Sequence, residues 1–241
     1  MTPEDRTGPP ATRPQLPSLT TETLVPARTL PFATRDDLQL GRRFFHFANG
    51  LATASAYALL FTHEQVIHVF GTIACVVYLI DRVRIAYPEW VARWVPAVNR
   101  LLVRAEEQVR ESAMTPYAIA VLLTILTVPK PAALVAILTL ATADPLAAIV
   151  GIRYGRRRIV RNRTVEGSLA FFGATFLVAA SVLGFGTGAG VFTVIEAALM
   201  IGLAAAACEL VPVRLDDNMT IPLFVGFVTW IVAGSLGIAL G

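Results

Sequence analysis

One acidic residue stands inside a long apolar stretch of this sequence. Asp144 follows an uncharged run that begins at Pro131, and Pro145 comes directly after it. An ionised carboxylate at the centre of a membrane helix costs about 2.5–3.5 kcal/mol, and such residues normally face a protein interior and mark a functional path. Arg153 lies nine residues further on, about 13 Å along a helix, and Pro145 should loosen the helix at that depth. We expect Asp144 to act in catalysis or metal binding; the alternative is a structural ion pair with an arginine of another helix.

A segment rich in arginine and glycine follows. Six arginines fall within residues 153–163, and glycines flank the end of the preceding apolar run. Glycine permits close approach of a ligand to the backbone, and the N-terminal amides of the next helix favour anions. We expect a triphosphate cradle formed by Gly151, Gly155, Arg163, Thr164, Glu166, Gly167 and Ser168. Within it, Glu166 could hold Mg²⁺ or cap the helix.

Two more polar groups border apolar runs. Asp216, Asp217 and Asn218 precede the last run. Three oxygen-bearing side chains in a row suit Mg²⁺, which keeps waters and bridges substrate phosphates; the alternative is a solvated turn. Arg42, Arg43 and His46 begin the first run, and taken alone they are typical of a basic anchor at a membrane surface.

These groups share one chemistry. Transfer of a phosphoryl group from a nucleotide to a lipid is catalysed by positioning and by charge neutralisation through Mg²⁺ and cationic groups. It therefore requires arginines, carboxylates and a membrane-buried acid. A lipid alcohol and a nucleoside triphosphate are therefore the expected partners.

Composition indicates how these residues are positioned. The 241 residues are 55% hydrophobic and 15% charged, whereas soluble domains carry about a quarter charged residues, and the mean hydropathy is +0.64. Several uncharged runs approach or exceed the roughly 20 residues that cross a bilayer core. We predict an all-α, polytopic transmembrane bundle of about seven spans. The predicted spans are 45–62, 65–81, 114–129, 131–152, 167–185, 190–209 and 219–240.

The basic residues set the orientation. With the N-terminus cytosolic, nineteen of the twenty basic residues fall in the tail and in the loops 82–113, 153–166 and 210–218, and only Lys130 lies outside. This partition follows the positive-inside rule. It also argues against nucleic acid as a partner, although the net charge is +3. We expect a multi-pass integral membrane protein, in the plasma (inner) membrane if the source is bacterial.

Two segments are expected outside the spans. Residues 1–40 are polar and rich in proline, which is typical of a disordered cytosolic tail, and 41–241 would form the transmembrane catalytic domain. Residues 90–110 repeat apolar side chains at helical spacing, with two tryptophans beside arginines. This pattern predicts an amphipathic helix in the headgroup layer.

From about Arg42 to the C-terminus, the sequence resembles the CTP-dependent lipid kinases that include dolichol kinase, phytol kinase and the CTP-dependent diacylglycerol kinase. The matching motifs are Asp144-x-x-Ala-Ala148-x-x-Gly151-x-x-x-Gly155, Arg163-Thr-x-Glu166-Gly167-Ser168, Arg42-Arg43-x-x-His46 and Asp216-Asp217-Asn218-x-x-Ile-Pro222. Arg43 and Arg163 replace lysines of the family pattern, which keeps the charge but changes donor geometry. Pro145 stands where a small residue is commoner.

The resemblance implies transfer of the γ-phosphate of CTP, with Mg²⁺, to the hydroxyl of a membrane alcohol. Asp144 would be the general base or a Mg²⁺ ligand. Arg42, Arg43 and Arg163 would neutralise phosphates, beside His46. Glu166, Asp216, Asp217 and Asn218 would bind Mg²⁺ or the base and ribose. The acceptor lipid, the preference for CTP over UTP or ATP and the oligomeric state are not readable from the sequence.

Two other functions compete. A phosphatidate cytidylyltransferase also uses Mg-CTP at a membrane, but its Lys-Asp and Asp-Arg-x-Asp signature does not occur here. An ion-coupled transporter could use Asp144 as a carrier acid near the membrane midplane. The arginines gathered at one face suit phosphates better than a proton.

Overall fold

The computed structural model describes residues 40–90, 114–160, 163–211 and 217–241, which all lie in one compact unit, Arg35–Gly241. Within α1 the side chain of Arg42 is not described. The predicted tail up to residue 39, most of the predicted interfacial helix and Asp216 fall outside the described residues, so these three predictions stay predictions.

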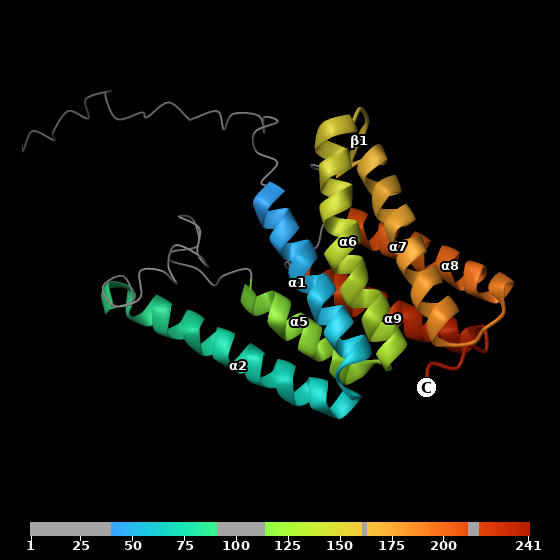
Figure 1. Ribbon diagram of the computed structural model, residues 1–241. Coiled ribbons are helices and arrows are strands. Elements are labelled where there is room, and N and C mark those ends of the chain that lie inside the picture. Colours follow the sequence, from blue (N-terminus) through green and yellow to red (C-terminus); the bar gives the residue numbers. More distant parts are fainter. Residues whose placement is uncertain (1–39, 91–113, 161–162, 212–216) are drawn as a thin grey trace, which may run out of the picture. The chain divides into compact units, whose positions relative to one another are not determined.

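The described residues form a helical bundle with one short strand pair between two of the helices (Figure 1). Each predicted span coincides with one helix, and most boundaries agree within a few residues. The helices are α1 (Leu40–Leu59), α2 (His63–Ala86), α5 (Met114–Thr127), α6 (Lys130–Tyr154), α7 (Val165–Gly186), α8 (Val191–Leu210) and α9 (Asp217–Ser235). The helical class of the bundle is therefore confirmed.

Five helices are long and apolar enough to cross a membrane: α2, α6, α7, α8 and α9. α5 is apolar but has only 14 residues, about 21 Å at 1.5 Å per residue, which is less than the roughly 30 Å hydrocarbon core. α1 is not among the five. A helical membrane bundle is thus supported, whereas the count of seven spans and the cytosolic N-terminus stay predictions.

Local sequence signals explain where several helices begin. Thr62 and Gln65 form a reciprocal capping box at the start of α2: Thr62 Oγ1 accepts from the Gln65 amide at 3.2 Å, and Gln65 Oε1 accepts from the Thr62 amide at 3.0 Å. α6 follows Pro129 at its N-cap and carries proline in its first turn, the position where a missing amide hydrogen costs nothing. Gly188, with φ of +65°, turns the chain between α7 and α8.

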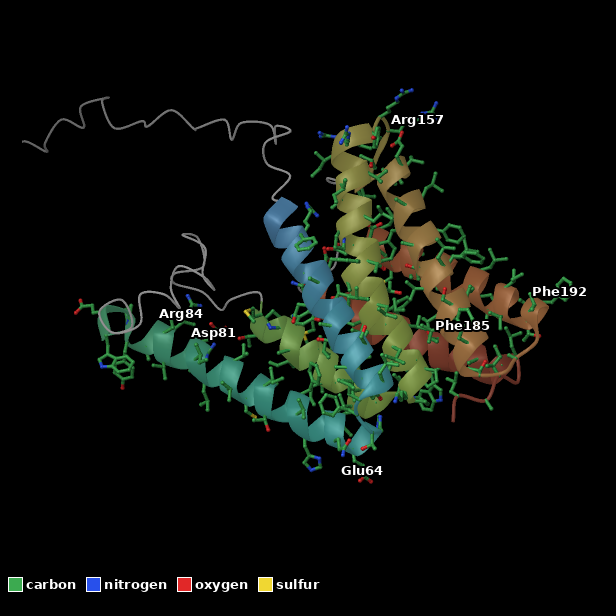
Figure 2. The ribbon with its side chains drawn as sticks, viewed as in Figure 1. Glu64, Asp81, Arg84, Arg157, Phe185 and Phe192 are labelled. Carbon is green, nitrogen blue, oxygen red and sulfur yellow. The ribbon has the colours of Figure 1, made fainter. Side chains whose placement is uncertain are left out.

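The bundle has two ends, and its helices alternate in direction between them. α6 ends and α7 begins at one end, here called the arginine end because residues 153–163 lie there. At the other end Lys130 Nζ donates to the carbonyl of Ala58 at 3.3 Å, which brings the last turn of α1 beside the start of α6. Figure 2 shows Arg157 at the arginine end and Glu64 at the opposite end.

Small residues let the helices pack closely. A Cβ atom built on Gly50 of α1 would lie 2.4 Å from Cβ of Ala141 on α6, so the two backbones approach at this point as closely as glycine allows. Such contacts between small residues are the usual means of association in membrane bundles, where lipid removes the hydrophobic drive between helices. This contact sits one turn from Asp144.

α2 and α5 are joined by a buried polar contact that the sequence did not suggest. Arg84 Nη2 donates to Asp81 Oδ1 at 3.1 Å, and Thr115 Oγ1 donates to Asp81 Oδ2. Asp81 and Arg84 are each only 3% exposed. Because a buried charge is costly unless it is paired, this contact fixes the end of α2 against the start of α5 (Figure 2).

Candidate active site at the arginine end

A strand pair connects α6 to α7 at the arginine end. β1 (Arg158–Val160) and β2 (Arg163–Thr164) run antiparallel, with Arg158 opposite Thr164. The all-α prediction did not include these strands, because two and three residues are too short to show a period in sequence. The pair returns the chain directly into α7, so Arg163 is held in a fixed place beside the first turn of that helix.

Thr164 caps α7 and is surrounded by glycines. Its Oγ1 accepts from the Gly167 amide at 3.1 Å. A Cβ atom on Gly151 would lie 3.1 Å from Thr164 Oγ1, and one on Gly155 would lie 2.7 Å from Thr164 Cγ2. One on Gly167 would lie 2.9 Å from the carbonyl of Ala147. The glycines therefore bring α6 and α7 together around the cap, a packing role that sequence reasoning missed. Their contact with a ligand stays a prediction.

Arg163 links three elements through its guanidinium group. Nη1 lies 3.0 Å from Glu209 Oε1 at the end of α8, and Nη2 lies 2.7 Å from Asp217 Oδ2 at the start of α9. Ser168 Oγ donates to the other oxygen of Glu209 at 3.1 Å. The Glu209 side chain is 2% exposed and that of Arg163 is 26% exposed. The ion pairs fix the orientation of a partly exposed cation.

Glu209 is the site residue that the sequence analysis did not select. Its signal was present: it is the acid at the end of an otherwise uncharged half of α8, the same kind of placement that singled out Asp144. Its place at the end of the helix made it resemble an ordinary loop acid. In the structure it holds Arg163 and Ser168 together.

Asp144 lies half-buried on α6 near this network. Electrostatic interactions connect it with Arg163, His46, Asp217 and Arg43, so residues from α1, β2 and α9 surround it. Among the described side chains it has no direct hydrogen bond or ion pair. The structural ion pair considered as the alternative for Asp144 is therefore not found in that part of the chain.

His46 and Arg43 come from the first turns of α1. The His46 ring packs edge-on against Tyr117 of α5, with 5.3 Å between the ring centroids. This contact fixes the imidazole on the inner side of α1. Asn218 follows Asp217 in the first turn of α9. The predicted residues thus converge on one end of the bundle, except Arg42 and Asp216, whose side chains are not described.

Glu166 has two features that bear on its role. Thr164 supplies the cap of α7, and the Glu166 carboxylate lies near the backbone amides of Arg156, Arg157 and its own residue. It therefore holds the loop before β1. Its Oε2 atom is nevertheless buried without a hydrogen-bond partner, which leaves one oxygen for a cation.

The described residues contain no group of three or more His, Cys, Asp or Glu side chains placed to hold a metal ion. A Mg²⁺ ion in a nucleotide site takes most of its ligands from phosphates and water and needs only one or two carboxylates. The unpartnered oxygen of Glu166 and the exposed carboxylate of Asp217 fit that sparse type of site.

The fold and site thus define a helical membrane bundle with a charged site at one end, grouped around a carboxylate on a membrane helix. A comparison with curated proteins adds a relative. Over 210 residues the chain is 27% identical to a protein described as "Probable phytol kinase 1, chloroplastic" from Oryza sativa subsp. japonica. The alignment covers 81% of this chain and 65% of the relative, so the chain spans about two-thirds of the length of that protein. No protein-family model matches the chain, and no solved structure matches it.

Proposed function

We propose that this protein is a lipid kinase that transfers the γ-phosphoryl group of a nucleoside triphosphate, CTP in the first instance, to the hydroxyl group of a membrane alcohol. The observation that carries the proposal is the place of Asp144. It is a half-buried carboxylate on an apolar helix, without a direct partner among the described side chains, and near Arg43, His46 and Arg163. The similarity to a protein named as a phytol kinase supports the same class of reaction.

The proposed reaction uses these positions. A lipid alcohol would enter from the bilayer with its hydroxyl at the depth of Asp144. The hydroxyl oxygen attacks the γ-phosphorus, the bond from that phosphorus to the β–γ bridging oxygen breaks, and the nucleoside diphosphate leaves. Asp144 accepts the hydroxyl proton, which is the role of a general base.

The cations act on the developing charge. Arg163 and Arg43 would neutralise the phosphates from two sides of Asp144, and the Glu209 ion pair keeps Arg163 in one orientation before the nucleotide binds. Glu166 and Asp217 would hold Mg²⁺, which supplies charge neutralisation on the phosphate oxygens when bound. Preorganised charges of this kind need little rearrangement during the reaction.

The test uses purified protein in lipid nanodiscs with Mg-CTP and a panel of membrane alcohols. We expect γ-labelled CTP to label an alcohol and α-labelled CTP to leave the lipid unlabelled. Label from the α-position in a lipid would instead identify a cytidylyltransferase. Absence of both labels, with ion-dependent uptake in proteoliposomes, would favour a transporter. UTP and ATP in parallel reactions measure the donor preference.

A further inference from the structure

Four arginines that the candidate site does not use lie at the connection between α6 and α7. They are Arg153 in the last turn of α6 and Arg156, Arg157 and Arg158 at the start of the strand pair. All four residues are exposed, and Figure 2 shows Arg157 at the tip of this end of the bundle. Among the described residues the ion pairs involve other arginines, Arg84 and Arg163, and none of these four.

The backbone that carries these arginines is held in place. The Val165 amide donates to the carbonyl of Arg157 at 2.9 Å, and the Glu166 carboxylate lies near the amides of Arg156 and Arg157. β1 pairs with β2 directly before α7 begins. The exposed guanidinium groups are therefore carried by a paired strand and not by an unsupported loop.

This strand pair lies at the level of the membrane surface. α6 has 25 residues, about 37 Å at 1.5 Å per residue, and α7 has 22 residues, about 33 Å. Both lengths exceed the roughly 30 Å hydrocarbon core, and both fall short of the roughly 40–45 Å that includes the headgroups. Because β1 and β2 connect the ends of these two helices, the strands lie in the layer of lipid headgroups.

Apolar side chains accompany the arginines. Ile159 and Val160 of β1 are 46% and 36% exposed, and Tyr154 is 58% exposed. The guanidinium carbon of Arg153 lies 5.6 Å from the centroid of the Tyr154 ring. Exposed apolar and aromatic groups beside cations are typical of segments at a membrane surface, where the apolar groups meet acyl chains and the charges meet phosphates. This combination distinguishes the connection from a basic loop that faces only water.

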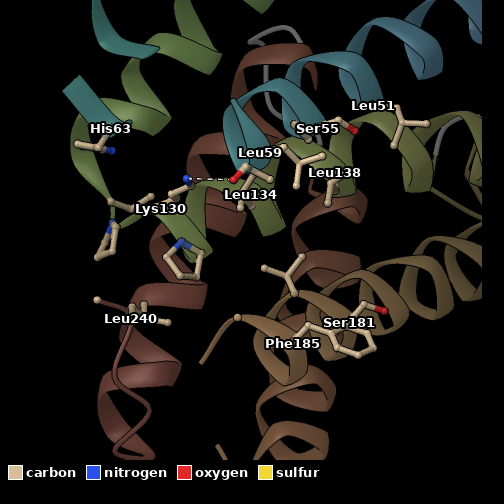
Figure 3. Close-up of a pocket in the computed structure, with 18 of the residues that line it drawn as sticks. Leu51, Ser55, Leu59, His63, Lys130, Leu134, Leu138, Ser181, Phe185 and Leu240 are labelled. Atoms are coloured by element: carbon tan, nitrogen blue, oxygen red, sulfur yellow. Dashed lines mark hydrogen bonds between the residues drawn. The ribbon is translucent and has the colours of Figure 1, made fainter. Parts of the chain in front are cut away.

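The opposite end of the bundle is different. Among the described residues it carries a single lysine or arginine, Lys130, which lines an apolar groove there (Figure 3). The Lys130 ammonium group is already held by the carbonyls of Ala58 and Phe61 at 3.3 and 3.4 Å. One cation that the protein itself binds attracts an anion less than four exposed ones. Lys130 therefore serves as an internal control for the arginines.

We propose that the exposed arginines of the α6–α7 connection bind the phosphate groups of anionic phospholipids in the adjacent leaflet, with Ile159 and Val160 against the upper parts of the acyl chains. A guanidinium group binds phosphate through two parallel hydrogen bonds. Each basic side chain near an anionic leaflet strengthens binding roughly fivefold, which is about 1 kcal/mol. The partner is a lipid and not a soluble phosphate, because the connection lies at the bilayer surface and combines charge with apolar contact. The inference is independent of the proposed function.

The test measures which lipids contact β1. Ile159→Trp is introduced into a protein in which Trp90, Trp94 and Trp230 are replaced by phenylalanine. The protein is reconstituted with lipids brominated near the headgroup, which quench the fluorescence of a tryptophan that they contact. We expect brominated phosphatidylglycerol to quench the introduced tryptophan more strongly than brominated phosphatidylcholine at the same mole fraction. High salt should reduce this preference, because it screens exposed charges.

Charge substitutions in this background identify the groups responsible. Arg157→Gln and Arg158→Gln should each lower the preference for phosphatidylglycerol roughly fivefold. Lys130→Gln removes the same charge at the opposite end and should leave the preference unchanged. Equal quenching by the two lipids, or no quenching by either, would overturn the proposal, as would equal effects of the Arg157 and Lys130 variants.

A nucleotide control separates lipid phosphate from free phosphate. Binding of CTP is measured in nanodiscs of pure phosphatidylcholine, where no anionic lipid competes. We expect Arg157→Gln and Arg158→Gln to bind CTP as the unsubstituted protein does. If both variants lose CTP affinity and keep the lipid preference, the arginines bind the nucleotide and the lipid assignment is wrong.

Discussion

Under the proposed function, Arg163 is a cation that ion pairs hold ready for an anion. Two carboxylates from different helices hold its terminal nitrogens, and one of them, Glu209, is almost completely buried. Asp217 is well exposed and only weakly desolvated, so it is the partner that an incoming phosphate could replace. Glu209 would keep the guanidinium in place during that exchange.

The first prediction concerns Asp144. Asp144→Asn removes the proton acceptor while preserving shape, so kcat should fall by about 10²–10⁴, the usual contribution of a general base. The measurement is phosphoryl transfer from γ-labelled CTP by purified protein. Nucleotide binding should persist, because Arg43 and Arg163 are unchanged.

Glu196→Gln is the control for this variant, because Glu196 is an exposed acid in the half of α8 remote from Glu209. It should keep full activity. Full activity in Asp144→Asn would remove the basis of the proposed function.

The second prediction concerns the ion pair of Glu209. Arg163→Met leaves a buried carboxylate with Ser168 as its remaining donor. Breaking a buried pair costs about 3–5 kcal/mol, and the partial exposure of Arg163 reduces this to about 1–3 kcal/mol. The midpoint of thermal unfolding in detergent should fall.

A double variant separates stability from function here. Adding Glu209→Gln to Arg163→Met neutralises the stranded charge and should recover most of the lost stability, without recovering activity. If the single and double variants unfold at the same temperature, the pair is not coupled.

Residue types indicated the candidate site, whereas the contacts within it could not be read from the sequence. Asp144 was identifiable because a charge in an apolar helix is costly and is therefore rarely present without a role. The arginines were identifiable because they follow it closely in the sequence. Glu209 and Asp81 were missed, since their partners come from other helices and no spacing in the chain reveals them. The packing of the glycines against Thr164 was not predicted, because a sequence cannot show which side chain lies beside them. Their contact with a ligand stays a prediction.

At the scale of elements, α6 and α7 behave as one unit. They are joined by the short β pair and held together where Gly151, Gly155 and Gly167 meet Thr164. Asp144 belongs to one helix and Arg163 to the strand that leads into the other. The spacing between acid and cation therefore depends on this helix contact.

The third prediction tests that contact. Gly167→Ala places a methyl group 2.9 Å from a backbone carbonyl of α6, so one of the helices must shift. We expect lower thermal stability and at least a tenfold lower kcat/KM, because a displacement of about 1 Å can cost 10²-fold in rate.

Gly173→Ala is the matched control for this substitution. Gly173 is on the same helix, and nothing lies within 4 Å of a Cβ atom built on it. Alanine should there stabilise the helix by about 0.5–1 kcal/mol. Equal behaviour of the two variants would contradict a role for the α6–α7 contact.

Helix positions were predictable because their signals are local. Long uncharged runs, the turn of glycines before α8 and the prolines around Lys130 gave boundaries close to those observed. The last helix ends at Ser235, five residues before the predicted boundary. α6 continues through Pro145, where a loosened helix was expected; the cost of a missing hydrogen bond is evidently met by packing against its neighbours, since Pro145 is buried.

At the scale of the whole molecule, alternating helix directions place all described polar site residues at one end. The fourth prediction tests this arrangement with single cysteines, after Cys75 and Cys208 have been replaced by serine. Arg157→Cys should react with a membrane-impermeant maleimide only from the cytosolic side. Glu64→Cys and Ala189→Cys should react only from the opposite side.

Glu64→Cys is informative for the number of spans, because Glu64 lies in the first turn of α2, directly after the α1–α2 connection. Reaction of Glu64→Cys and Arg157→Cys from the same side would show that α2, α5 and α6 do not make the three crossings expected between them.

α1 differs from the other helices in how it is held. It packs chiefly against α6, through the Gly50–Ala141 contact and the Lys130 hydrogen bonds at its last turn. Its first turns carry Arg43 and His46 toward Asp144. A tilt of α1 about that tethered end would widen the way in for a lipid and, in the same movement, withdraw positive charge from the acid. Entry of the lipid and assembly of the charged site would then require opposite positions of α1. Phosphoryl transfer could begin only after α1 had returned to its place beside α6.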